Sequence, residues 1–307
     1  MKYIIACVML LSCSIMQSKA CDVCGASSGN QNLGLLPQMY RHFVGVQYQY
    51  NEFSSRHVPL SETRPVWYGR EHYQTVQLWG RYCIGKRWQL FGFLPYRYNT
   101  GSYNSSGMTI KGIGDATAIV NYTLLQTADS SDNILRHRLQ GGAGIKIPLG
   151  SHSGVSQAER EGLPNMQPGT GSWDVPVNIN YTARYRNSGL NADLAYVMTT
   201  PNILEYKYGN RLNMQVSLFY WLQRNKFSIL PQAGIRFEYA LHDYDNYQRK
   251  WLNEQTGGYI TSAVAGVQMY YGKTGLQLQY SRPIAQYFGS GNITALQKID
   301  AGIILLF

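Results

Sequence analysis

Residues 209–223 read GNRLNMQVSLFYWLQ, and within this stretch apolar and polar side chains alternate with a period of two. Successive side chains of a β-strand point to opposite faces of the sheet, so the stretch predicts a strand with one apolar and one polar face. The apolar face carries Leu212, Met214, Val216, Leu218, Tyr220 and Leu222. The other face carries Arg211, Asn213, Gln215 and Ser217, and is completed by Phe219 and Trp221.

The same alternation recurs from residue 41 to the end of the chain, for example over residues 173–186. About twelve segments have the roughly 9–11 residues that a strand needs to cross a membrane. The composition agrees with a β-rich protein, because the 307 residues include 25 Tyr and 31 Gly and only 14% are charged. No apolar run reaches the length of about 18 residues that a membrane helix requires. The sequence therefore predicts an all-β, antiparallel barrel of about twelve strands.

The order of the connections indicates which face of this barrel meets lipid. Connections of about four residues, such as 84–87 and 271–274, alternate with longer ones. The predicted long loops are 54–70, 99–111, 149–172, 201–209, 241–257 and 285–295. Outer-membrane barrels have short periplasmic turns and longer outside loops. The pattern thus predicts an outer-membrane barrel with both termini in the periplasm.

Aromatic residues support an apolar face that is directed to lipid. Tyrosines on this face gather near strand ends, where amphipathic rings favour the membrane interfaces. Near the predicted periplasmic ends they are Tyr82, Tyr122, Tyr185, Tyr220 and Tyr271, and near the outer ends Tyr48, Tyr50, Tyr96, Tyr98, Tyr239 and Tyr280. The last strand ends at Phe307 and resembles the β-signal that the barrel-assembly machinery reads. We therefore expect two partners, outer-membrane lipid and that machinery.

The first forty residues predict export. Lys2 precedes an apolar run from Ile4 to Leu11, and Ser18-Lys19-Ala20 fits a small-x-small cleavage site. We expect residues 1–20 to be a signal peptide cleaved near Ala20, residues 21–40 a periplasmic segment, and residues 41–307 the barrel. A lipid anchor at Cys21 is an alternative interpretation of the same stretch.

Three cysteines remain after the predicted cleavage, namely Cys21, Cys24 and Cys83. The pair Cys21 and Cys24 has Cys-x-x-Cys spacing, and Cys83 faces inward by parity near the periplasmic end. Such thiols form a disulfide or hold a soft metal such as copper(I), and the sequence leaves both open. An alternative function is therefore a metal-handling or docking protein with a periplasmic partner at the N-terminal segment. No other cofactor is expected.

Strand parity directs a set of charged side chains into the predicted lumen. The basic ones are Arg81, Arg97, Arg138, Lys146, Arg184, Arg211, Arg236 and Lys298, and the acidic ones are Asp115, Asp193, Glu238 and Asp300. Charged rings set ion selectivity in pores, so an excess of basic residues would favour anions. The alternative is that these charges pair with acidic and amide side chains and seal the interior.

Three motifs lie in the middle third of the chain: GIGDA at Gly112–Ala116, IKIPLG at Ile145–Gly150 and PGTGSWD at Pro168–Asp174. Together they resemble the outer-membrane transporter family that includes the phenol meta-pathway outer-membrane proteins. The resemblance implies a channel or transporter for small compounds of an aromatic or hydrophobic kind. Anionic small molecules are the other substrate class, expected from the basic lumen residues. The motifs also have structural explanations, because glycine allows close backbone approach and Pro148 with Gly150 would end a strand.

Two further functional classes are disfavoured by the sequence. A lipid-active barrel enzyme needs a Ser–His pair on the lipid face. His72 and His137 have outward parity, but no serine is an obvious neighbour at matching depth, so we expect no enzymatic activity. Nucleic-acid binding is not expected either. The basic residues form no dense run, and an exported membrane protein would be separated from the nucleic acids of the cell.

Overall fold

The computed structural model describes residues 42–57, 67–103, 106–127, 135–150, 166–203, 205–245, 249–253 and 256–307. Nearly all regular structure in these residues is β-strand. The strands are β1 Phe43–His57, β2 Trp67–Ile84, β3 Trp88–Tyr103, β4 Ser106–Ile113, β5 Ala116–Gln126, β6 Leu135–Ile147, β7 Val175–Tyr185, β8 Ser188–Met198, β9 Tyr206–Lys207, β10 Arg211–Tyr220, β11 Leu222–Arg224, β12 Phe227–Ala240, β13 Tyr244–Asp245, β14 Lys250–Trp251, β15 Gly258–Tyr271, β16 Thr274–Phe288 and β17 Ile293–Leu306. No helix in this part of the chain is long and apolar enough to span a membrane.

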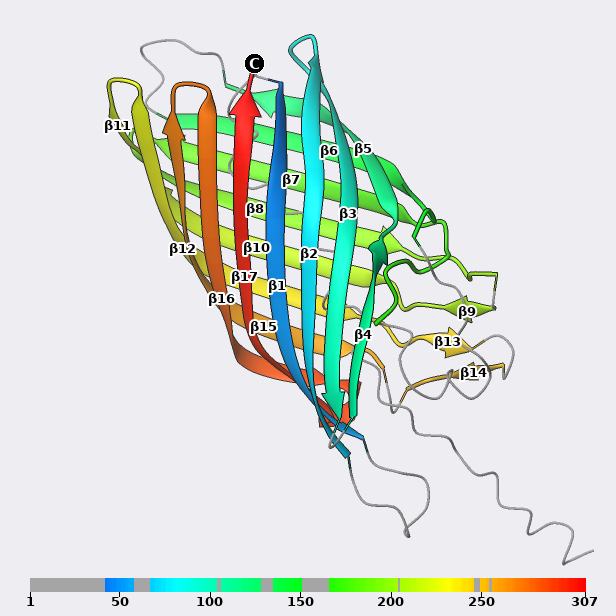
Figure 1. The fold of residues 1–307 in the computed structure, drawn as a ribbon. Helices are drawn as coiled ribbons and strands as arrows, with labels where there is room; N and C mark the ends of the chain where they lie inside the picture. The colour runs from blue at the N-terminus through cyan, green and yellow to red at the C-terminus, as the bar shows by residue number, and fades with distance from the viewer. Residues whose placement is uncertain are drawn as a thin grey trace, which may run out of the picture.

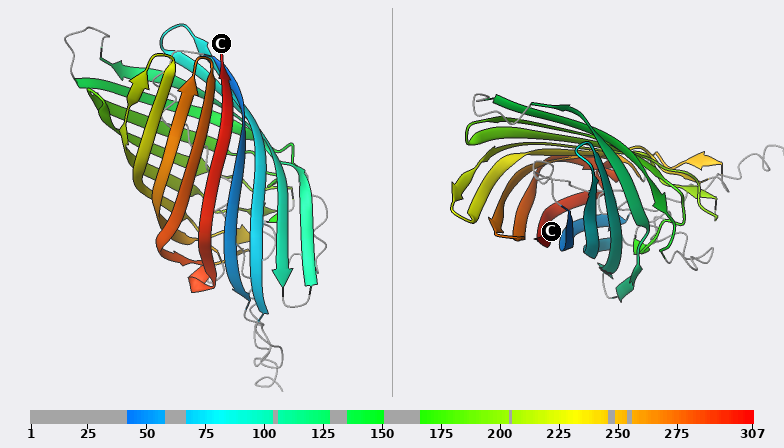
Figure 2. Two further views of the ribbon diagram at one scale, coloured as in Figure 1. Left: turned by 60° about the vertical axis from the view of Figure 1, so that its left-hand side comes forward. Right: turned by 90° about the horizontal axis from the view of Figure 1, so that it is seen from above.

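Twelve strand crossings close into one antiparallel barrel (Figures 1 and 2). β4 and β5 together make one crossing, which is interrupted at Gly114 and Asp115, and β10 and β11 make another, interrupted at Trp221. The ring closes because β1 pairs with β17 and β10 pairs with β12. The small strands β9, β13 and β14 form a separate three-stranded sheet. The predicted all-β barrel of about twelve strands is confirmed.

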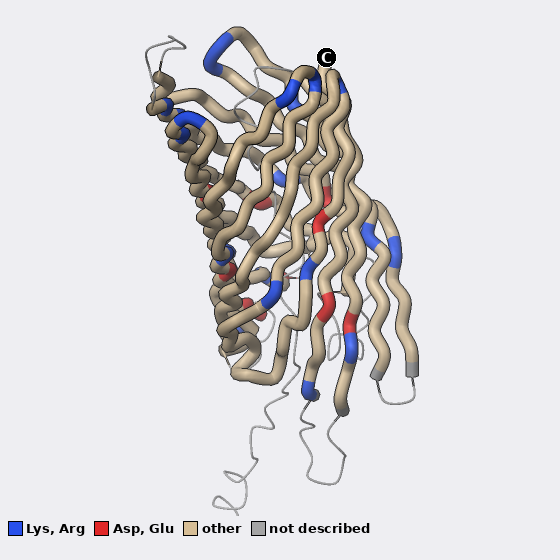
Figure 3. Tube along the Cα trace, turned by 90° about the vertical axis from the view of Figure 1, so that its left-hand side faces the viewer, with Lys and Arg blue, Asp and Glu red and all other residues tan. Residues whose placement is uncertain are grey.

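One end of the barrel carries the short turns and the C-terminus, and we call it the short-turn end (Figure 1). Each of the four short turns that the structure describes contains one residue in the left-handed region, namely Gly85, Arg186, Asn225 and Gly272, with φ of 63°, 52°, 53° and 60°. Two-residue hairpin turns favour such φ values because they match the strand twist. The turns also carry Lys or Arg, seen as blue segments near the C-terminus in Figure 3. By the rule for outer-membrane barrels, we expect this end to face the periplasm; we call the other the long-loop end.

Two of the predicted long loops are wrong. β3 continues to Tyr103 and pairs with β4 from Ser106 onward, so residues 99–111 belong mostly to a hairpin. β16 continues to Phe288 and β17 begins at Ile293, leaving only a short 3₁₀ turn, Gly289–Gly291, between them. Both segments are rich in Ser, Thr, Asn and Gly, which is typical of loops. Strand pairing uses backbone groups, however, and at about 3.3 Å per residue these hairpins extend beyond the membrane.

The apolar face of the strands points outward. In β10, Met214, Val216 and Leu218 are 40%, 45% and 64% exposed, whereas Gln215 and Ser217 are 8% and 2% exposed. The alternation predicted for residues 209–223 is therefore present, with its apolar side on the surface that lipid would cover.

Buried apolar residues form two clusters at the two ends of the interior. The cluster at the short-turn end contains Phe43, Trp79, Phe91, Phe93, Ile119, Phe219, Leu230, Tyr270, Ile304 and Leu306. The cluster at the long-loop end contains Phe53, Tyr73, Met166, Ala240, Ile260, Phe288, Ile293 and Ala295. Buried polar side chains such as Gln47, Gln77, Asn121 and Gln140 occupy the same interior. The interior is thus amphipathic, and the site described below lies in it.

The terminal Phe307 is attached to the start of the barrel and is 60% exposed. Its backbone N–H donates to the His42 carbonyl at 3.0 Å, and the two rings stack with centroids 5.6 Å apart. We expect deletion of Phe307 to lower the amount of assembled barrel in the outer membrane several-fold, because we propose that this ring is read by the assembly machinery. Heat-modifiable mobility of the protein in outer-membrane fractions measures this amount. Phe307→Tyr keeps the ring and serves as the control; equal amounts of wild type and deletion would contradict the proposal.

Candidate functional site

Residues 166–174, which precede β7, lie inside the barrel near its long-loop end. We call them the inner segment. Met166 has 0% exposure and belongs to the apolar cluster formed by Phe53 of β1 and Tyr73 of β2. The Asn99 side chain of β3 donates to the Met166 carbonyl at 2.9 Å. The inner segment therefore contacts several strands from the inside.

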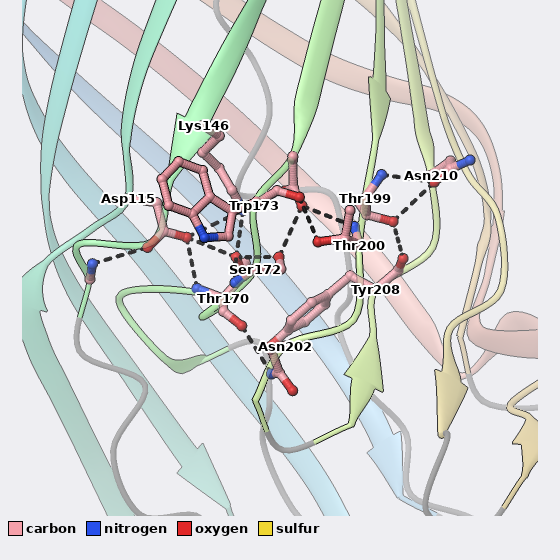
Figure 4. Close-up of polar contacts among 12 residues, drawn as sticks. Asp115, Lys146, Thr170, Ser172, Trp173, Thr199, Thr200, Asn202, Tyr208 and Asn210 are labelled. Atoms are coloured by element: carbon pink, nitrogen blue, oxygen red, sulfur yellow. Dashed lines mark hydrogen bonds and ion pairs between the residues drawn. The ribbon is translucent and has the colours of Figure 1, made fainter.

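A charged cluster holds the inner segment, and we call it the latch. It consists of Asp115, Lys146, Thr170 and Ser172, which are labelled in Figure 4, and of Asp174. The Lys146 ammonium lies 3.2 Å from Asp115 Oδ2 and also pairs with Asp174 and donates to the Thr170 hydroxyl. The side chains of Lys146, Asp115 and Asp174 are only 14%, 3% and 5% exposed. Because so little water screens them, these charges interact more strongly than exposed pairs do.

Asp115 connects three separate parts of the chain. Its Oδ1 accepts the Gly150 N–H at 3.0 Å, and its Oδ2 accepts the Thr170 N–H and hydroxyl, each at 2.8 Å. Ser172 Oγ in turn donates to Asp174 Oδ1 at 2.9 Å. Hydrogen bonds to a carboxylate are among the stronger ones in proteins. The latch therefore fastens the inner segment to the start of β5 and the end of β6.

Two glycines allow the backbones to meet at the latch. A Cβ at Gly150 would lie 2.5 Å from the Gly169 Cα, and a Cβ at Gly169 would lie 2.7 Å from the Gly150 Cα. Neither position accepts a side chain without backbone movement. The close approach brings the Gly150 and Thr170 N–H groups to the same Asp115 carboxylate.

The loop after β8 supports the inner segment from the other side (Figure 4). Asn202 Nδ2 donates to the Thr170 carbonyl at 3.0 Å, and Thr200 Oγ1 donates to the Trp173 carbonyl at 2.6 Å. Within this loop, Thr199 Oγ1 bonds both Asn210 Oδ1 at 2.9 Å and the Tyr208 carbonyl. Two consecutive connections at the long-loop end are therefore joined through one polar network.

A second charged network contains other predicted lumen residues. Arg236 donates twice to Gln215 Oε1, at 3.0 and 2.9 Å, and lies 3.7 Å from Asp300. Lys298 pairs with Glu238 at 3.2 Å, and the Asn180 amide donates to Asp193. The pair Arg236–Asp300 joins β12 to β17 although β15 and β16 lie between them in the ring. The side chains of the pairs Arg236–Asp300 and Lys298–Glu238 therefore reach across the interior.

The remaining predicted basic residues face inward but do not gather in one ring. Arg81 lies over Phe43 at 5.2 Å from the ring centroid, Arg184 over Trp221 at 4.8 Å and Arg211 over Tyr208 at 5.9 Å. Arg138 is 6% exposed. Guanidinium–ring stacking is a favourable contact. Aromatic residues of the lumen therefore help to position these three arginines.

The lumen is less basic than strand parity alone suggested. Glu71 and Asp174 are also buried, at 1% and 3% exposure, and both face inward. Glu71 accepts hydrogen bonds from Ser55 and Tyr73, each at 2.8 Å, and Asp174 belongs to the latch. These two carboxylates offset part of the positive charge that was expected to favour anions.

Several predictions concern residues that the structure does not describe. The signal peptide 1–20, the segment 21–40 and with it Cys21 and Cys24 lie outside the described residues. Cys83 is described, is half-buried and faces inward, and its backbone N–H donates to His42 Nδ1 at 3.1 Å. Within the described ranges, no three His, Cys, Asp or Glu side chains are placed to hold a metal ion. The alternatives for the thiols stay predictions.

Sequence reasoning missed Thr170 and Ser172 and did not foresee that the three motifs meet. Of the latch residues, Asp115 comes from GIGDA, Lys146 from IKIPLG, and the other three from PGTGSWD; Gly150, which donates its N–H to Asp115, also belongs to IKIPLG. The one feature of the sequence that could have indicated Thr170 and Ser172 is the alternation of polar side chains at positions 170, 172 and 174. His72 and His137, considered for an enzyme, bond tyrosine hydroxyls of neighbouring strands, Tyr50 at 2.8 Å and Tyr181 at 2.7 Å.

No protein-family model and no curated protein sequence matches this chain. Its fold is similar to the crystal structure of an outer-membrane channel from Pseudomonas putida F1, with a TM-score of 0.62 and 12% identity over 87% of this chain and 96% of that one. More distant likenesses include the NanC porin (TM-score 0.42, 10% identity, 85% and 98% of the two chains) and the CymD monoaromatic hydrocarbon channel (TM-score 0.43, 10% identity, 92% and 94%). At such identities the likeness concerns the fold, and this chain has the fold of an outer-membrane β-barrel.

Proposed function

We propose that this protein is an outer-membrane channel for small molecules, gated by the inner segment. The observation that carries the proposal is the latch, which fastens a segment inside a closed barrel through buried ion pairs to Lys146. A latch of this kind gives a gate two discrete states, one with the segment held and one with it released. We place the protein in the outer membrane after signal cleavage near Ala20, and we propose no enzymatic activity.

Two further observations support this proposal. The latch is built from the three motifs by which the chain resembles the transporter family of the phenol meta-pathway proteins, so membership of that family is part of the proposal. The fold similarity to an outer-membrane channel points the same way. The inward basic residues Arg81, Arg138 and Arg184 would line the path beyond the gate and Arg211 would lie beside the gate, with their charge partly offset by Glu71 and Asp174.

Releasing the latch should open the channel. We expect Lys146→Met to raise the time-averaged current through planar bilayers at least tenfold, because a loss of about 1.4 kcal/mol in the closed state already shifts the equilibrium tenfold. The purified barrel is measured at fixed salt and voltage, with the reversal potential recorded in a salt gradient.

Lys298→Met provides a matched control. This substitution also removes a lumenal lysine from a carboxylate, at 3.2 Å, but that carboxylate belongs to Glu238 of β12 and not to the latch. Its current should stay near that of the wild type. A latch variant that is folded and conducts no more than the wild type would contradict the gate, and a wild type and latch variant that are both silent would contradict the channel.

A further inference from the structure

One wall of the interior carries amide side chains that the protein does not satisfy. We call Gln89, Asn121, Gln140 and Asn178 the amide row. Within the described residues, both amide atoms of Gln89, Asn121 and Asn178, and Oε1 of Gln140, have no hydrogen-bond partner. Gln89, Asn121 and Gln140 are 2%, 1% and 0% exposed. Leaving a buried polar atom unsatisfied costs about 1–3 kcal/mol, so several in one place call for an explanation.

These amides are neighbours across four strands. Gln89 of β3 pairs in register with Asn121 of β5, Asn121 with Gly142 of β6, and Gly142 with Asn178 of β7. Directly opposed residues have Cβ atoms only about 4.5–5.5 Å apart. Gly142 has no side chain, and Asn121 Oδ1 occupies the place where its Cβ would be. Gln140, two residues before Gly142, faces the same side of β6.

Elsewhere among the described lumenal residues, several amides are satisfied by the protein, and in Gln77, Asn99 and Gln279 only one of the two amide atoms lacks a partner. Gln215 accepts from Arg236, Gln268 accepts from Tyr270 at 3.0 Å, and Asn180 donates to Asp193. The chain is therefore able to pair lumenal amides with its own side chains, and it does so on β7, β10 and β15. The difference between these positions and the amide row indicates that the row serves a ligand.

The chemistry of the row selects among ligands. Each primary amide presents a carbonyl acceptor and an NH₂ donor group. A carboxylate offers only acceptors and would leave the amide carbonyls unpaired, and a hydrocarbon would satisfy neither group. A hydroxyl group both donates and accepts, so adjacent hydroxyls match the row completely. Phe91 and Ile119, the next inward residues of β3 and β5, are 1% and 3% exposed and border the row with apolar surface suited to the C–H face of a carbon ring.

We propose that the amide row binds neutral, polyhydroxylated ring solutes and is the substrate-selecting site of the lumen; this inference rests on the channel proposed above. Isothermal titration of the purified full-length protein with myo-inositol and with cyclohexanecarboxylate compares two six-membered rings that differ in hydroxyl and carboxylate groups. We expect myo-inositol to bind at least tenfold more tightly.

Variants then assign the binding to the row. Gln89→Met and Asn121→Leu should weaken myo-inositol binding about tenfold, as loss of about 1.4 kcal/mol would do. Gln268→Met makes the same chemical change at an amide that is satisfied by Tyr270, and should leave the affinity unchanged. In the absence of solute, Gln89→Met and Asn121→Leu should unfold at a denaturant concentration equal to or higher than that of the wild type, because they remove unsatisfied atoms. If the amides had a purely structural role, both variants would unfold at a lower denaturant concentration.

The outcomes separate this inference from the proposed channel. Binding of myo-inositol without any conductance would contradict the channel and support the row. Conductance with no myo-inositol binding, or with tighter binding of cyclohexanecarboxylate, would overturn the row and leave the channel standing. Equal loss of affinity in Gln89→Met and Gln268→Met would also overturn it.

Discussion

Replacing Lys146 by Met is expected to lower the free energy of unfolding by about 3–5 kcal/mol, the cost of leaving a buried charge without its partner. The effect is large because one ammonium serves two carboxylates, Asp115 and Asp174, which are only 3% and 5% exposed. Methionine keeps most of the lysine volume, so packing changes little. Guanidinium unfolding of the refolded barrel, followed by tryptophan fluorescence, measures the difference.

A triple variant controls for the loss of charge itself. Asp115→Asn, Lys146→Met and Asp174→Asn together remove all three charges, and replacing a complete buried ion cluster by neutral groups is often close to neutral in stability. We expect it to recover most of the loss. A Lys146→Met protein within about 0.5 kcal/mol of the wild type, the range of ordinary surface substitutions, would show that the latch contributes no stability.

The fold could be predicted because alternation in a membrane barrel carries two kinds of information at once. The period of two defines the strands, and the apolar side of each strand defines the face that meets lipid. Neighbouring residues of β10 show this, because Met214 is exposed on the outer face and Gln215 is buried in the interior. Strand ends were less predictable. Residues 99–111 and 285–295 were expected to be loops, but their backbones continue the ladder of the neighbouring strand. Outside the membrane, polar side chains do not oppose the pairing of β-strands. The amino-acid composition of these segments is therefore a poor guide to strand length.

The candidate site was predictable only in part. Parity correctly directed Asp115 and Lys146 inward, because both lie on or beside regular strands. Their pairing with each other and with Asp174 depends on the register between β5, β6 and β7, which alternation does not define. Thr170 lies 55 residues from Asp115, and the alternation at residues 170, 172 and 174 does not indicate which strands these side chains face. The amide row could not be found either, since satisfied and unsatisfied amides look identical in a sequence.

The glycines of β6 contain information of another kind. β6 includes Gly141, Gly142 and Gly144, although glycine in a strand interior weakens the strand. A Cβ at Gly144 would overlap the Ala118 carbonyl oxygen and lie 2.9 Å from the Ile119 Cα, both backbone atoms of β5. No side-chain rotation relieves such contacts. Gly144 is therefore required by the close approach of β5 to β6 in the strands that carry the latch.

Gly144→Val is expected to destabilise the folded barrel by about 3 kcal/mol, the upper end of the cost of over-packing, because β5 and β6 must separate. Gly92→Val is the matched control: Gly92 lies in β3, pairs with Ala118, and a Cβ there would meet nothing within 4 Å. Valine favours strands, so this variant should be as stable as the wild type or slightly more. Heat-modifiable mobility and guanidinium unfolding of both proteins decide the matter. If Gly144→Val folded as well as Gly92→Val, β5 and β6 would have room to separate without cost, and the close approach would not be what requires glycine.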